Sequence, residues 1–199
     1  MVRKTSILRS CAGFVLVTAI AWIAFTLPDR IEAIGALAFA RLPLEWPLLL
    51  LMLLLVPRPW RRFTSLACGL LLLLILFLKI ADIGTRAAFQ RPFNPYLDAK
   101  MLADGWNLMS GTIGSVAAFA GVVAGIVGLA LVLMLFLVAA RWLTDIPRPA
   151  RSWLILGMVV TSAFGGAAIL LGTPRVEARM PGYLSNRLAL IVRSVQDMH

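Results

Sequence analysis

Histidine is nearly absent from this sequence: the only one is His199. A Ser-His-Asp relay needs a histidine beside its nucleophile, and a multi-histidine metal centre needs several, so neither can be assembled within this chain. The two cysteines, Cys11 and Cys68, are expected to be small apolar packing residues. Phosphate-binding loops, dinucleotide fingerprints and zinc motifs are also missing. The sequence therefore predicts no catalytic, metal-binding or cofactor-binding residues.

Charge is scarce as well. Only 14% of the residues are charged, whereas 61% are hydrophobic and the mean hydropathy is +0.92. Too little polar material is left to cover a soluble surface, which indicates an integral membrane protein. The 19 Lys and Arg residues outnumber the 9 Asp and Glu residues. Such an excess suits nucleic acid or anionic lipid, and the position of the charges decides between them.

Uncharged runs predict five membrane-spanning helices, since about 20 apolar residues cross a hydrocarbon core of about 30 Å. The runs cover residues 10–28, 46–56, 63–78, 112–140 and 153–172. The first is expected to be a retained helix rather than a signal peptide, because it is long and lacks a small-residue cleavage site near Pro28. The second is too short alone and must borrow from residues 31–44, with Pro43 and Pro47 bending it. Arg41 and Glu45 would then form a candidate pair near one interface.

The cations divide unevenly between the predicted connections. The residues before the first span and the connections 57–62 and 141–151 carry nine of the 19 Lys and Arg residues but a single acid, Asp145. By the positive-inside rule this side is cytoplasmic. The N-terminus is therefore expected inside, and residues 79–111 and the C-terminus outside, in a bacterial inner membrane. The excess of basic residues is then explained by the orientation of the chain in the membrane and by contact with lipid, and nucleic acid is not an expected partner.

Residues 79–111 form the best candidate for a functional surface, because a lipid-facing helix would not tolerate their charges. Pro92 and Pro95 are expected to prevent a regular helix there, so the segment is predicted to be an ordered outer loop at the membrane boundary. Its candidate lipid-headgroup or partner residues are Lys79, Asp82, Arg86, Arg91, Asn94, Asp98, Lys100 and Trp106.

Two main roles remain open for this loop. Arg91 can hold a phosphate through its planar fork, with Lys79 and Lys100 adding positive charge, as a lipid headgroup requires. Alternatively, Arg91 pairs with Asp98 to fix the loop while aromatic residues anchor it, and this structural role is favoured. Asp82 and Asp98 could also bind a cation, although nothing in their spacing selects one. Lys79 is expected to extend its stem toward the headgroups.

The fourth predicted span carries a small-residue pattern, Gly121-xxx-Gly125, followed by Gly128. Such patterns let membrane helices approach closely. The favoured interpretation is contact with another helix of the same bundle, with glycines of the fifth span as a partner face. Oligomerisation through this face is the alternative.

Residues 183–197 predict an amphipathic helix, because Leu184, Leu188, Ile191 and Val195 recur at helical spacing. Such a helix lies on the outer leaflet or docks against another domain, and the first is favoured. The sequence therefore predicts an all-α polytopic membrane protein. Its parts are a five-helix transmembrane domain, residues 1–175, and a juxtamembrane segment, residues 176–199.

Three short runs carry a family resemblance: residues 78–82 (LKIAD), 91–98 (RPFNPYLD) and 105–111 (GWNLMSG). The chain resembles the N-terminal membrane region of bacterial membrane-bound sulfatase-like proteins of the alkaline phosphatase superfamily. The resemblance implies about five helices before a large periplasmic metal-dependent hydrolase or transferase domain. That family's nucleophile and metal ligands lie in the soluble domain, which is not in this sequence, so no catalytic residue can be carried over.

The expected function is that of a non-catalytic membrane module that positions a periplasmic protein partner near lipid. The alternative is a structural or accessory subunit of a larger respiratory or photosynthetic complex, with the glycine-rich fourth span and the cytoplasmic arginines as contact surfaces. An enzyme or transporter acting at the loop is disfavoured by the missing histidines and by the lack of charge at the membrane centre. Membrane lipids and one protein, periplasmic or within the membrane, are the expected partners, and no cofactor is expected.

Overall fold

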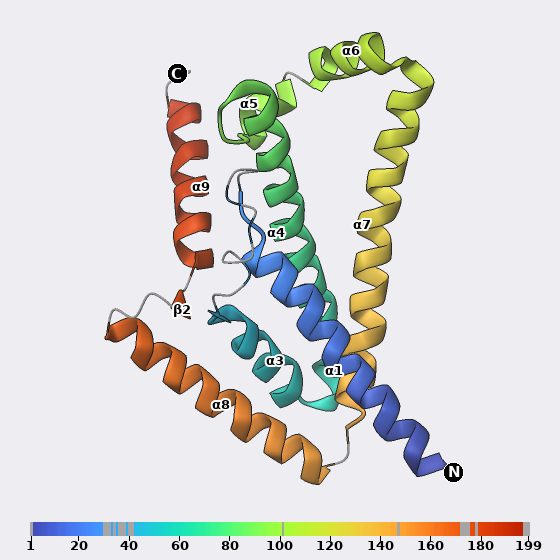
Figure 1. The fold of residues 1–199 in the computed structure, drawn as a ribbon, viewed down its shortest axis with the longest axis vertical. Helices are drawn as coiled ribbons and strands as arrows, with labels where there is room; N and C mark the ends of the chain where they lie inside the picture. The colour runs from blue at the N-terminus through green and yellow to red at the C-terminus, as the bar shows by residue number, and fades with distance from the viewer. Residues whose placement is uncertain are drawn as a thin grey trace.

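The chain folds as a bundle of helices (Figure 1). The computed structural model describes residues 2–29, 33, 35, 39, 42–100, 102–146, 148–171, 176–177 and 179–196. The helices are α1 (Val2–Thr26), α3 (Glu45–Leu55), the 3-10 turn η2 (Arg58–Trp60), α4 (Arg61–Phe89), α5 (Pro95–Lys100), α6 (Leu102–Ile113), α7 (Ser115–Thr144), α8 (Arg148–Leu170) and α9 (Arg179–Gln196). Two short strands, β1 (Leu42–Pro43) and β2 (Val176–Glu177), pair in parallel.

Four stretches are long and apolar enough to cross a membrane: Leu8–Thr26, Arg58–Ala87, Ser115–Thr144 and Pro149–Ile169. They coincide with the first, third, fourth and fifth predicted spans. The prediction of an all-α polytopic membrane protein is therefore confirmed. The fourth span begins at Ser115, close to the predicted Thr112, because Gly114 has a positive φ of 84° and breaks the chain between α6 and α7.

The second predicted span is wrong in its extent. Leu42 and Pro43 are extended and paired with β2, so α3 begins only at Glu45 and has 11 residues. A helix of that length reaches about 17 Å, roughly half of a hydrocarbon core. Helix α3 instead packs between α1, α4, α7 and α8, burying Leu50, Leu53 and Leu54. Arg41, and with it the predicted Arg41–Glu45 pair, lies outside the described residues.

The tightest helix contact joins α1 to the C-terminal half of α7. Small side chains recur on the buried face of α1 at residues 10, 13, 21 and 24. A Cβ atom on Gly13 would lie 2.6 Å from the Ala139 carbonyl oxygen and 2.7 Å from the Leu143 backbone nitrogen. The absence of a side chain at Gly13 therefore lets the two backbones touch.

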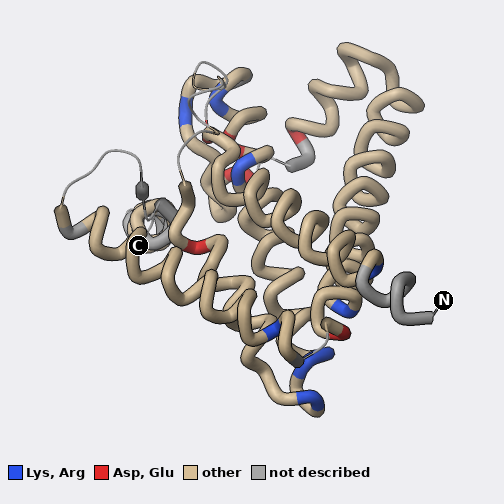
Figure 2. Tube along the Cα trace, turned by 60° about the horizontal axis from the view of Figure 1, so that its bottom comes forward, with Lys and Arg blue, Asp and Glu red and all other residues tan. Residues whose placement is uncertain are grey.

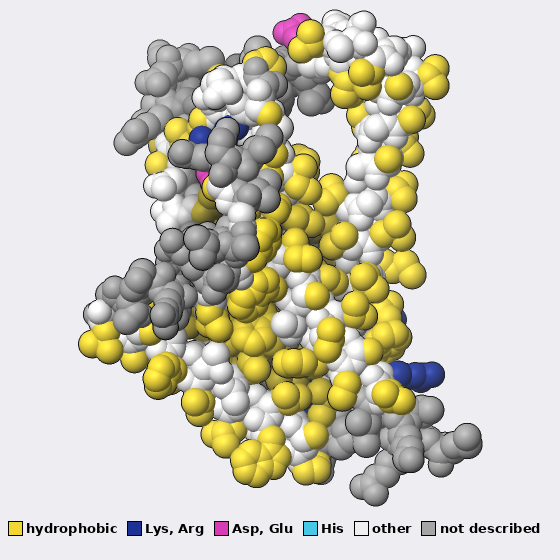
Figure 3. Space-filling model, viewed as in Figure 1, with side chains coloured by type: hydrophobic (Ala, Val, Ile, Leu, Met, Phe, Trp, Pro, Cys, Tyr) yellow, Lys and Arg dark blue, Asp and Glu magenta, His cyan; other side chains and the backbone are white. Residues whose placement is uncertain are grey.

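The favoured interpretation of Gly121, Gly125 and Gly128, a close contact with another helix of the same chain, is wrong, whereas oligomerisation through this face stays a prediction. All three are exposed, and a Cβ atom on any of them would meet nothing within 4 Å among the described residues. The N-terminal half of α7 stands apart from α4 and α1, with an open space between them (Figure 3). The C-terminal half of α7 packs against α1 and α4 instead, and there it buries Phe136, Ala139, Ala140 and Leu143.

The charged residues gather at the two ends of the bundle (Figure 2). We call one the basic end, where the N-terminal part of α1 lies with the connections α3–α4 and α7–α8; its described cations include Arg58, Arg61 and Arg151. The opposite end, which we call the polar end, holds the C-terminal part of α4 with α5 and α6. This distribution agrees with the division of connections that the positive-inside count predicts.

Candidate functional site

The segment 79–111 is mostly helical, contrary to the predicted loop. Helix α4 continues through the charged residues to Phe89 and ends where Gln90 adopts a left-handed conformation, with a φ of 55°. Pro95 stands at the first position of α5, where its missing N–H costs no helical hydrogen bond. Asn94 caps this helix, since its Oδ1 accepts from the backbone nitrogens of Tyr96 (3.1 Å) and Leu97 (3.5 Å). Among the described residues of this segment, those outside helices are residues 90–94.

Asp82 is the centre of the polar end. Its side chain is fully buried, at 0% exposure. One carboxylate oxygen accepts a hydrogen bond from the Tyr183 hydroxyl at 2.6 Å, and the other accepts from the Phe93 backbone nitrogen at 2.9 Å. A single carboxylate on α4 thereby holds both the 90–94 loop and α9. Hydrogen bonds to a buried charge are stronger than neutral ones, so the Asp82 carboxylate fixes α4, the 90–94 loop and α9 to one another.

Lys79 lies one turn before Asp82 on the same face of α4 and is 4% exposed. Its Nζ donates to the Phe25 carbonyl oxygen at 2.8 Å. That carbonyl is in the last turn of α1, where oxygens lack helical partners and a cation is favourable. The expectation that Lys79 extends toward lipid headgroups is therefore wrong: the ammonium turns inward because the α1 terminus offers it an acceptor.

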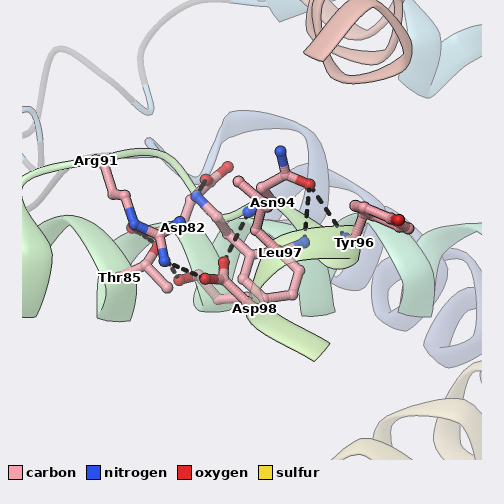
Figure 4. Close-up of polar contacts among 9 residues, drawn as sticks. Asp82, Thr85, Arg91, Asn94, Tyr96, Leu97 and Asp98 are labelled. Atoms are coloured by element: carbon pink, nitrogen blue, oxygen red, sulfur yellow. Dashed lines mark hydrogen bonds and ion pairs between the residues drawn. The ribbon is translucent and has the colours of Figure 1, made fainter. Parts of the chain in front are cut away.

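Arg91 takes the structural role that the sequence favoured. Its guanidinium forms an ion pair with Asp98, and the other Asp98 oxygen accepts from the Asn94 backbone nitrogen at 2.8 Å (Figure 4). The guanidinium also lies 5.7 Å from the centre of the Phe89 ring. Asp98 on α5 therefore holds the 90–94 loop that follows α4.

The remaining candidates of the segment are Arg86, Trp106 and Lys100. Arg86 pairs with Asp29, just after α1, at 3.2 Å. Trp106 is exposed on α6. The side chain of Lys100 lies outside the described part of the chain. Asp82, Arg91, Asn94 and Asp98 thus lie around the 90–94 loop, and Lys79 lies one turn from Asp82 on α4. We call these five residues, together with Tyr183, the Asp82 cluster.

Tyr183 and Asp29 were not among the sequence candidates. Asp29 follows a span and Tyr183 opens the amphipathic helix, so neither belongs to a recognisable motif. One signal was present: a carboxylate one turn beyond a predicted span needs donors if it is buried, and tyrosine is a rare donor in this chain, which has two. Burial, with a contribution from Asp29 that Arg86 opposes, raises the pKa of Tyr183 to about 12.

A pH-dependent release of α9 follows from this pKa. Because the folded pKa of about 12 lies above the ordinary value of 10, the protonated phenol stabilises the fold fully below pH 10. We expect this contribution to disappear as the pH rises from 10 to 12. In the Tyr96→Phe variant Tyr183 is the only tyrosine, so the ultraviolet absorbance of phenolate reports its titration. An ordinary pKa near 10 in that variant would contradict the docking of α9 on Asp82.

We also expect Arg91 and Asp98 to be energetically coupled. Arg91→Ala should lower the free energy of unfolding by about 1 kcal/mol, and Asp98→Ala by more, because it also loses the Asn94 backbone contact. The double variant should cost less than the sum of the two, as measured by thermal or chaotrope unfolding in detergent. Arg62→Ala, an exposed arginine at the basic end, serves as the control. Additive effects would show that the ion pair contributes nothing.

The Asp82 cluster is built to hold segments together. Each of its charged groups contacts another protein group, as the contacts above show for Lys79, Asp82, Arg91 and Asp98. Among the described residues, no three His, Cys, Asp or Glu side chains come close enough to hold a metal ion. Comparison with protein-family models, with curated proteins and with solved structures finds no match.

Proposed function

We propose that this protein is a non-catalytic membrane scaffold that fixes its C-terminal helix at the polar end and thereby positions a protein partner close to lipid. The observation that carries the proposal is the hydrogen bond from Tyr183 on α9 to the buried Asp82 on α4. It joins residues 101 positions apart and uses a costly buried carboxylate for attachment. Such an anchor suits a protein in which the orientation of a juxtamembrane segment matters.

The partner belongs on the outer side of a bacterial inner membrane. The basic end, placed in the cytoplasm by the positive-inside rule, leaves the Asp82 cluster and α9 on the periplasmic side. The resemblance to sulfatase-like membrane regions adds a chemical class for the partner: a hydrolase or phosphotransferase of the alkaline phosphatase superfamily. Such enzymes act on lipid-borne substrates, which a scaffold at the membrane boundary would bring within reach.

A second candidate is an accessory subunit of a larger membrane complex. The observation in its favour is the N-terminal half of α7, where Val116, Phe119 and Ile126 are exposed and the helix stands apart from the rest of the bundle (Figure 3). In a larger assembly another membrane helix would cover this face. Lipid chains would cover this face equally well, so it supports the accessory subunit less directly than the attachment of α9 supports the scaffold.

Purification in mild detergent tests both candidates. We expect a soluble-domain hydrolase or phosphotransferase to co-purify with the wild-type chain and with Asp104→Ala, an exposed acid on α6. The same protein should be lost from Asp82→Ala, because α9 is then released. Recovery of respiratory or photosynthetic subunits, equally from all three, would instead support the second candidate. Recovery of a hydrolase that is indifferent to Asp82→Ala would contradict the role of α9.

A further inference from the structure

A cavity of about 430 Å³ lies at the basic end, opposite the Asp82 cluster. It sits where α3 ends, where α4 begins and where α7 connects to α8. Its lining residues are Leu55, Val56, Pro57, Arg58, Arg61, Thr144, Asp145, Ile146 and Arg151. Three arginines thus meet around one space, two from the η2–α4 junction (Arg58 and Arg61) and one from α8 (Arg151), with one acid among them.

Two of these arginines hold the surrounding helices. Arg61 donates to the Thr144 carbonyl oxygen at 3.2 Å, and Arg151 donates to the Leu54 carbonyl oxygen. Both acceptors lie in the last turn of a helix, where carbonyls need donors. These contacts use one N–H group of each guanidinium, whereas an arginine carries five. The helix ends therefore position the arginines and leave donors for another acceptor.

Arg61 shows most directly that an acceptor is missing. Its Nε is buried and has no hydrogen-bond partner among the described residues. Arg61 also lines the cavity, so the donors of its guanidinium that the Thr144 contact does not use are available to an anion bound there. Arg61 is also the first residue of α4, a 29-residue helix whose N-terminus has no side-chain cap. The positive end of the helix dipole adds to the attraction for an anion.

We propose that this cavity binds a phosphate group, held by Arg58, Arg61 and Arg151. The planar guanidinium suits phosphate oxygens, and three positive charges exceed the single charge of Asp145. The volume exceeds that of a single phosphate and leaves room for the group that carries it. An anionic lipid headgroup is one source and a soluble phosphate is the other. Trp60, which lies between Arg58 and Arg61 in the sequence and is 62% exposed, is a residue type typical of the membrane interface, where headgroups lie.

Titration of the full-length chain in detergent tests the site. The lipid probe is short-chain phosphatidylglycerol, with phosphatidylcholine as the zwitterionic control, and binding is counted by native mass spectrometry. In a separate arm, inorganic phosphate is titrated and followed by thermal stabilisation. Arg58→Gln removes an exposed lining charge, and Arg61→Lys keeps the charge but removes the fork. Arg62→Gln is the matched control, because Arg62 is exposed next to Arg61 and does not line the cavity.

We expect Arg58→Gln and Arg61→Lys to weaken phosphatidylglycerol binding about tenfold, Arg62→Gln less than twofold, and Asp145→Asn to tighten it. If inorganic phosphate binds with this dependence and phosphatidylglycerol does not, the site stands and its ligand is soluble. Equal losses in Arg58→Gln and Arg62→Gln would show a general surface charge effect and overturn the proposal. Absence of binding in both arms would overturn it as well.

Discussion

Replacing Gly13 by valine should lower the free energy of unfolding in detergent by about 2–3 kcal/mol. A Cβ atom at this position would lie 2.6 Å from the Ala139 carbonyl oxygen, 2.7 Å from the Leu143 backbone nitrogen and 2.8 Å from the Trp142 Cβ. Two of the three neighbours are backbone atoms, which cannot turn away as a side chain can. The α1 and α7 backbones must therefore separate, and the packing of Ala139 and Leu143 is lost with them.

Gly125→Val provides the matched control for this expectation. Gly125 lies on α7 too, but a Cβ atom there meets nothing within 4 Å among the described residues. The same substitution should therefore change stability by less than about 0.5 kcal/mol. Thermal unfolding of both variants in one detergent decides the matter. Equal effects at the two sites would mean that the α1–α7 contact is not the tight one, and a larger effect at Gly125 would restore the original prediction for the glycine run.

The contrast between Gly13 and Gly125 shows how far hydropathy and small-residue patterns reach. Apolar runs predict four helices correctly, because length and hydrophobicity alone determine whether a segment can span a bilayer. A GxxxG pattern says that a helix can approach another closely, but not that it does. The choice depends on where two helices cross, and this is set by connections such as the sharp break at Gly114. The spaced small residues of α1, from Ser10 to Ala24, were an equally good signal.

Local and distant contacts at the polar end also differ in predictability. The Arg91–Asp98 pair was anticipated because the two residues are seven positions apart in a proline-bounded segment. Proline patterns misled in one respect: Pro95 begins a helix, and Pro92 leaves α4 intact through Phe89. The partners of Asp82 and Lys79 were out of reach, since Tyr183 and Phe25 are 101 and 54 positions away. The sequence shows only that a buried Asp82 would need a donor, and it does not identify which distant residue supplies it.

The two ends of the bundle use charge in opposite ways. At the polar end Lys79 and Asp82 are buried and committed to Phe25, Phe93 and Tyr183, so the groups stabilise the fold. At the basic end Arg61 and Arg151 also hold helix ends, but with the exposed Arg58 they surround a cavity and keep donors that these contacts do not use. Loss of a charge should therefore damage the fold at the polar end, whereas loss of the exposed Arg58 should weaken the proposed ligand binding at the basic end. Among the residues of the polar end, Asp82 is the one whose loss should destabilise the fold most.

Asp82→Ala should cost about 3 kcal/mol of folding free energy, because it leaves the Tyr183 hydroxyl and the Phe93 N–H without their buried acceptor. Tyr183→Phe removes only one of these hydrogen bonds and should cost about 1–2 kcal/mol. The double variant should then cost little more than Asp82→Ala alone, since both substitutions break the same contact. Asp104→Ala, which removes an exposed acid from α6, should leave stability unchanged.

Protease cleavage locates the damage from these substitutions. Since Tyr183 attaches α9 to α4, both Asp82→Ala and Tyr183→Phe should expose residues 179–196 to cleavage while α4 and α7 stay protected inside the detergent micelle. Asp82→Ala should act more strongly, because it also frees the 90–94 loop. If α9 is cleaved at the wild-type rate in both variants, the helix is held by other contacts and Asp82 serves only the loop. If α4 itself becomes sensitive, Asp82 supports the whole polar end rather than the attachment of α9.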